Sequence, residues 1–190
     1  MPERIPPREY ALKDLALSAA PSVSMLAAVI SLVAPNYIEG TKKTLVHTER
    51  GTIYIERGKA EAYRAAIHFI QDEHRKGRSV LVVPEETSLY FLSGVTPPAR
   101  VYVFTPGVLA PGKMVEGVID EVESHHVEYL IWSNRTFPEY GVARFGVDFD
   151  QEFGSYLMTR YRPTAGVQPF QGGVWRAVVW ERSERLGQKK

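Results

Sequence analysis

The stretch SVLVVPEETSLYFLSGVTPPARVYVF, residues 79–104, contains two short apolar runs separated by a segment that fits a short helix over residues 87–92. The runs SVLVV (79–83) and VYVF (101–104) show little alternation with polar residues, and a proline-containing turn follows each of them. Apolar runs of this length fit strands that are buried on both faces, as parallel strands are. The stretch therefore predicts two parallel strands joined by a helical crossover.

The sequence on both sides continues this alternation of strands and helices. Apolar residues recur at helical spacing in three longer segments, at residues 59–76, 113–125 and 149–161. A third apolar run, YLIW at residues 129–132, predicts another buried strand. Together these elements predict an α/β fold in which a mainly parallel, Rossmann-like sheet lies between two layers of helices.

Extended segments are predicted at both ends of this region. Residues 44–57 carry β-branched side chains around Arg50-Gly51, which predicts an extended segment broken by a turn. Residues 166–170 and 174–181 are joined through Gln171-Gly172-Gly173 and predict a C-terminal β-hairpin.

The stretch Leu15–Ala34 (LALSAAPSVSMLAAVISLVA) has no charged side chain. About 20 helical residues cover the roughly 30 Å of hydrocarbon in a bilayer, so this stretch predicts an N-terminal hydrophobic helix that spans a membrane. A buried, alanine-rich core helix is the alternative, since the stretch is only moderately apolar and contains Pro21. The predicted organisation is a tail and hydrophobic helix over residues 1–36, an α/β domain over 37–183 and a charged tail over 184–190.

The composition argues against several classes of function. With 23 Lys and Arg against 22 Asp and Glu, the formal net charge of +1 provides no basic field for a nucleic acid. The absence of cysteine excludes disulfide scaffolds and thiolate chemistry. No G-x-G-x-x-G or G-x-x-x-x-G-K-[ST] motif is present, and His125-His126 fits a helix C-terminus better than a metal site. The sequence therefore predicts no nucleic-acid partner, no cofactor and no metal.

Polar side chains follow the predicted strands, where an open parallel sheet binds its ligands. Arginine offers a bidentate fork to anions, and asparagine offers both a donor and an acceptor to sugar hydroxyls. Ordinary structural roles are the alternative, for example an ion pair between Arg135 and Glu139 or a turn contact of Thr105. The predicted ligand-binding residues are Glu85, Glu86, Thr105, Asn134, Arg135 and Tyr140. No catalytic residue is predicted.

Four stretches of the chain resemble one protein family. They are VLVVPEETSLYFLSGVTPPARVYVFTPGVLAP (80–111), YLIWSNRTFPEYG (129–141), FGVDFDQEFGSYLMTRYRP (145–163) and WRAVVWERS (175–183). They look like the C-terminal extracytoplasmic domain of bacterial membrane glycosyltransferases of the protein mannosyltransferase and aminoarabinose transferase type. Members of that superfamily transfer a sugar from a polyprenyl-phosphate donor to a lipid, glycan or protein acceptor.

The resemblance implies an accessory role rather than catalysis by this chain. In that family the catalytic acids lie in an early extracytoplasmic loop, and no segment of this sequence corresponds to that loop. The implied function is donor or acceptor recognition beside the transmembrane catalytic part of a glycosyltransferase. Leu15–Ala34 would anchor the chain in the inner membrane, with the α/β domain on the periplasmic side. The alternative is a soluble α/β module that binds a partner or a small ligand.

Overall fold

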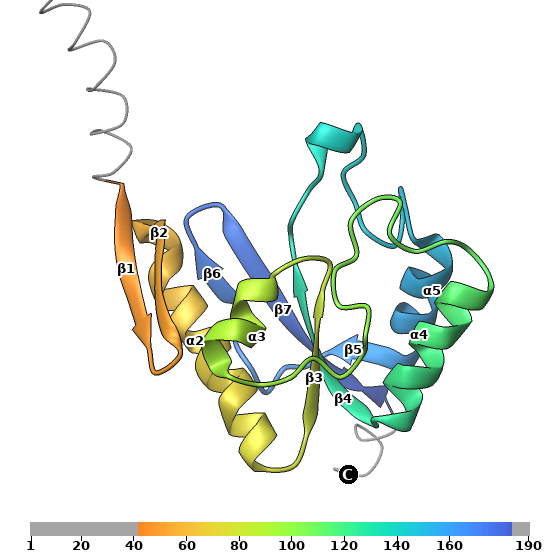
Figure 1. Ribbon diagram of the computed structural model, residues 1–190, viewed down its shortest axis with the longest axis horizontal. Helices are drawn as coiled ribbons and strands as arrows, with labels where there is room; N and C mark the ends of the chain where they lie inside the picture. The colour runs from red at the N-terminus through yellow and green to blue at the C-terminus, as the bar shows by residue number, and fades with distance from the viewer. Residues whose placement is uncertain (1–41, 184–190) are drawn as a thin grey trace, which may run out of the picture. The chain divides into compact units, whose positions relative to one another are not determined.

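The computed structural model describes residues 42–183 (Figure 1). The predicted hydrophobic helix at Leu15–Ala34 and the charged tail at 184–190 lie outside the described residues. None of the helices within 42–183 combines the length and the apolar character that crossing a bilayer requires.

A five-stranded mixed sheet forms the centre of the fold, and its strand order corrects the predicted architecture. The strands run in the order β3 (Ser79–Val83), β4 (Val127–Ser133), β7 (Trp175–Arg182) and β5 (Tyr161–Pro163), with β6 (Phe170–Gly172) also paired to β7. Only β3 and β4 are parallel; β7 is antiparallel to β4, β5 and β6. The prediction of a mainly parallel, Rossmann-like sheet is therefore wrong.

The predicted strand VYVF at residues 101–104 forms no ladder, and the hydrogen bonding of the β3 edge gives the physical reason. The Tyr90 hydroxyl accepts a hydrogen bond from the Val82 amide (2.8 Å) and donates one to the Val80 carbonyl (3.2 Å). A side chain thus satisfies edge groups that a neighbouring strand would otherwise pair. The other side of β4 is occupied by β7, so the sheet does not incorporate a strand at residues 101–104.

Helices cover both faces of this sheet (Figure 1). One face packs against α2 (Arg57–Arg75) and α3 (Thr87–Ser93), and the other packs against α4 (Lys113–Ser124) and α5 (Gln151–Arg160). Successive residues of β3 alternate between the two cores: Val80 and Val82 face the first, and Leu81 and Val83 face the second. This two-sided burial explains why β3 reads as an uninterrupted apolar run.

Two hairpins complete the described fold. Strands β1 (Lys43–Thr48) and β2 (Gly51–Glu56) form a separate two-stranded sheet, in line with the turn predicted near Arg50. Strands β6 and β7 pair through Gly172 and Trp175, whereas the predicted first strand at residues 166–170 is irregular up to Phe170. A Cβ atom at Gly172 would lie 2.1 Å from the Gly58 carbonyl oxygen, so only glycine allows this hairpin to approach α2 so closely.

Candidate ligand-binding groove

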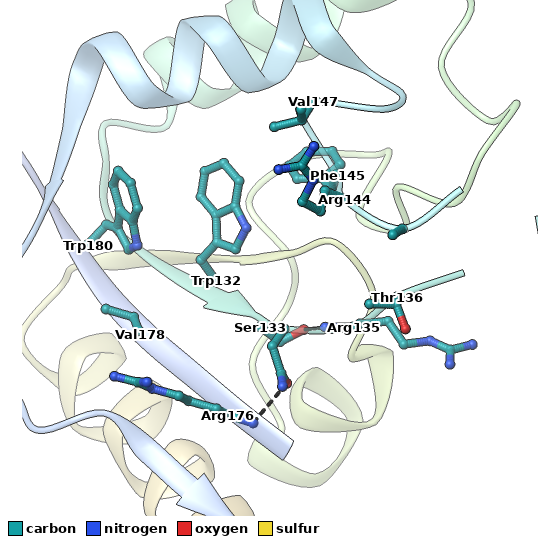
Figure 2. A pocket seen from close by; sticks show the side chains of 12 residues that line it. Trp132, Ser133, Arg135, Thr136, Arg144, Phe145, Val147, Arg176, Val178 and Trp180 are labelled. Atoms are coloured by element: carbon teal, nitrogen blue, oxygen red, sulfur yellow. Dashed lines mark hydrogen bonds between the residues drawn. The ribbon is translucent and has the colours of Figure 1, made fainter. Parts of the chain in front are cut away.

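An open groove of about 670 Å³ lies over the C-terminal end of β4 and the first part of β7. This volume is within the range that small-molecule sites occupy. The loop over residues 143–147 forms one of its walls, and Figure 2 shows the side chains that surround it. The groove is lined by twelve residues: Trp132, Ser133, Asn134, Arg135, Thr136, Ala143, Arg144, Phe145, Val147, Arg176, Val178 and Trp180.

Three aromatic rings lie along this groove, two of them placed by strand alternation and the third, Phe145, by the loop over residues 143–147. In β7, Ala177 and Val179 are buried in the core beside α2, so Val178 and Trp180 face the opposite side of the sheet. Trp132 of β4 is paired directly with Val178. The indoles of Trp132 and Trp180 stack with centroids 5.1 Å apart, and Phe145 lies 5.4 Å from Trp132. These rings stand side by side above the sheet and give the groove an apolar wall (Figure 2).

Three arginines line the groove, but their surroundings differ. The guanidinium of Arg135 contacts Glu85 (3.3 Å) and Glu139 (2.8 Å), and its side chain points away from the two indoles (Figure 2). Arg144 forms a longer ion pair of 3.4 Å with Asp148.

The guanidinium of Arg176 has neither a hydrogen-bond acceptor nor an ionic partner within residues 42–183. Because the groove has no aspartate, glutamate or histidine in its described lining, its charge is positive.

Asn134 holds the strand that carries Arg176. Its side-chain Nδ2 donates to the Val174 carbonyl (2.9 Å), and its Oδ1 accepts from the Arg176 amide (2.9 Å). The Asn134 backbone amide also donates to the Arg176 carbonyl (2.8 Å). The amide group predicted to bind a ligand instead extends the pairing of β4 with β7 and fixes the Arg176 backbone at the groove.

Glu86 lies on the other side of the sheet, in a buried polar cluster next to α2. Its carboxylate accepts hydrogen bonds from Trp175 Nε1 (2.6 Å) and from the Tyr63 hydroxyl (2.7 Å), and Lys59 Nζ lies 3.4 Å away. Burial, together with the negative charge of Glu86, raises the pKa of Tyr63 far above its ordinary value. With donors on both oxygens, Glu86 ties the β6–β7 hairpin to α2 and does not line the groove.

The remaining predicted residues occupy separate places. Glu85 reaches the groove only through Arg135. The Thr105 carbonyl closes a turn by accepting from the Val108 amide, and Thr105 does not line the groove. Tyr140, in the short 3-10 helix at Pro138–Tyr140, is 56% exposed and packs its ring beside Phe137. Of the six predicted residues, the groove itself brings together Asn134 and Arg135.

The predicted set lacks every aromatic groove residue and two of the arginines, namely Trp132, Arg144, Phe145, Arg176 and Trp180. The signal for Arg176 and Trp180 is present in WRAVVW at residues 175–180, where a period of two places these residues and Val178 on one face of a strand. Arg144 lies in an irregular loop whose course no periodicity predicts.

Within residues 42–183, the polar side chains that line the groove are three arginines, two hydroxyls and one amide. Its described lining contains no carboxylate or imidazole, and the Ser133 hydroxyl accepts a hydrogen bond from the Arg135 amide (3.4 Å). Across residues 42–183, no group of three His, Asp or Glu side chains is placed to hold a metal ion. Comparison of the chain with protein-family models, with curated proteins and with solved structures found no match.

Proposed function

We propose that the domain is a non-catalytic recognition module whose groove binds a sugar ring. In this proposal it serves as an accessory domain of a polyprenyl-phosphate-sugar-dependent membrane glycosyltransferase and contributes to donor or acceptor recognition. The observation that carries the proposal is the stacked pair of half-buried indoles, Trp132 and Trp180, on an open sheet face.

The shape of the groove favours a ligand with two different faces. A sugar ring presents C–H groups on one face, which pack on aromatic rings, and hydroxyl groups around its edge, which remain hydrated. Several lining residues, among them Thr136, Ala143 and Val147, are exposed, so a bound ring would keep one side in water. A wholly apolar ligand would gain less, because part of its surface would stay exposed.

The resemblance noted in the sequence adds the membrane context to this proposal. The domain would act on the periplasmic side of the inner membrane, with catalysis performed by a transmembrane partner. Within the groove, the absence of a lining carboxylate or imidazole supports recognition without chemistry.

Tryptophan fluorescence of the full chain tests sugar binding directly. Two of the three tryptophans line the groove, while Trp175 packs in the other core and donates to Glu86. We expect a saturable change in emission when monosaccharides are titrated, and we expect Trp180→Leu to weaken it strongly. Tyr54→Leu is the matched control, because Tyr54 is an aromatic residue that is 71% exposed and lies outside the groove. No saturable change with any neutral or charged monosaccharide would refute the proposal.

A further inference from the structure

We infer that Arg176 forms an anion-binding subsite in this groove, so that the sugar it takes carries a carboxylate or a phosphate group. This inference rests on the proposed function, because it identifies the class of ligand for the same groove. Arg176 was not among the ligand-binding residues predicted from the sequence.

The strand register places the Arg176 side chain close to the indole of Trp132. Trp132 is paired with Val178, and Arg176 is two residues away from Val178 along β7 on the same face. Diagonal neighbours of this kind have Cα atoms about 7–8 Å apart, within reach of long side chains. In Figure 2 the Arg176 side chain lies beside Val178, below the two indoles. One pyranose ring with a charged substituent can therefore contact an indole and the guanidinium at the same time.

The charge distribution makes Arg176 the cation available to a ligand. Arg135 is engaged by two carboxylates, those of Glu85 and Glu139, and Arg144 is paired with Asp148. Arg176 has no such partner within residues 42–183. An arginine fork binds a carboxylate or a phosphate through two parallel hydrogen bonds, and here no competing acid has to be displaced.

The backbone around Arg176 is held in place before a ligand arrives. Its amide and carbonyl groups are both fixed by Asn134, as described above. A fixed Cα position reduces the ordering that binding requires. Only the exposed side chain of Arg176 remains to be ordered, so its substitution should alter binding and leave the fold intact.

Matched neutral and charged sugars test the inference in the full chain by fluorescence titration. The probes are glucose, glucuronate and glucose 6-phosphate, with inorganic phosphate as a competitor. We expect both charged sugars to bind about tenfold or more tightly than glucose, with an advantage that falls as salt rises. Arg176→Gln should remove this advantage over glucose and leave the melting temperature unchanged. Arg75→Gln is the matched control, because Arg75 is an exposed arginine outside the groove.

The outcomes separate this inference from the proposed function. Equal binding of the three sugars, or a preference for charge that survives Arg176→Gln, overturns the anion subsite while sugar binding by the groove stands. Failure of every sugar to bind overturns both. A preference for only one of the two charged sugars supports the subsite and identifies whether it takes a carboxylate or a phosphate.

Discussion

A partly buried carboxyl group with one unpartnered oxygen atom gives the sharpest prediction about stability. Asp150 immediately precedes α5, where an acidic side chain usually caps the helix, but its side chain makes no cap hydrogen bond. Its Oδ2 atom is buried with no hydrogen-bond partner within residues 42–183. Burial raises the pKa of Asp150 from its ordinary value of 3.8 to about 6. We therefore expect Asp150→Asn to stabilise the protein at neutral pH.

The size and sign of the effect follow from proton linkage. The folded chain binds the Asp150 proton more tightly than the unfolded chain, so this group lowers the stability progressively as the pH rises from about 4 to about 6. Each pKa unit corresponds to about 1.4 kcal/mol. Because Asp150 is only partly buried, solvent screening reduces the full shift, and we expect about 1–2 kcal/mol at pH 7.5. Asparagine also tolerates the left-handed backbone at this position, where φ is 49°.

Urea denaturation of the full chain at pH 4.0, 5.5 and 7.5 measures this effect. The free energy of unfolding of Asp150→Asn relative to the native chain should increase with pH over this range. Asp148→Asn is the matched control with the opposite sign. The Asp148 carboxylate accepts hydrogen bonds from the Ala143 and Arg144 amides, which lower its pKa, so its contribution to stability is lost as the pH falls. A stability difference for Asp150→Asn that does not change with pH would refute this reasoning.

Three further substitutions test contacts on the α2 and α3 side of the sheet, each by the midpoint of urea denaturation at neutral pH. Tyr90→Phe should cost about 1–2 kcal/mol, because the edge of β3 loses the hydroxyl that pairs with Val82; no change would mean that water replaces it. Glu86→Ala should cost about 1–3 kcal/mol, because Tyr63 and Trp175 lose their buried acceptor; a neutral result would show that these donors find other partners. Gly172→Ala should cost about 1–3 kcal/mol through its clash with α2, and an unchanged midpoint would contradict that close approach.

Helices and buried strands were predictable from the sequence because their apolar periods arise locally. The helix predicted at residues 59–76 is α2 at Arg57–Arg75, and the one at 113–125 is α4 at Lys113–Ser124. The run SVLVV at 79–83 coincides with β3. In each case the pattern of side chains on one face, or on both, decides the local structure.

Strand direction was not predictable in the same way. A strand covered by helices on both faces has the same apolar run whether its neighbour is parallel or antiparallel, so YLIW at residues 129–132 could not reveal that β7 runs against β4. The run VYVF at 101–104 has suitable residues for a strand, but a strand also needs a free edge to pair with. The Tyr90 hydroxyl occupies that edge of β3, a tertiary contact that no local pattern indicates.

The direction of β7 also explains which groove residues the sequence reasoning found. The prediction selected polar residues that follow strands, and two of these, Asn134 and Arg135 after β4, line the groove. An antiparallel neighbour brings the beginning of its own strand to the same edge. The groove therefore includes Arg176, near the start of β7, which a rule based on strand ends passes over.

Substitutions at different groove residues should affect binding and stability to different extents. Trp132 and Trp180 line the groove, but they also pack against the core beneath α4 and α5, so their substitution must change both sugar binding and folding. Arg176 is exposed and its backbone is held by Asn134, so its side chain can change with little effect on the core. The preference for charged ligands can therefore change by substitution of Arg176, whereas Trp132 and Trp180 are constrained by their packing in the core. A series of substitutions at Arg176 should alter the preference among charged ligands at constant melting temperature, whereas substitutions at Trp132 should not separate the two properties.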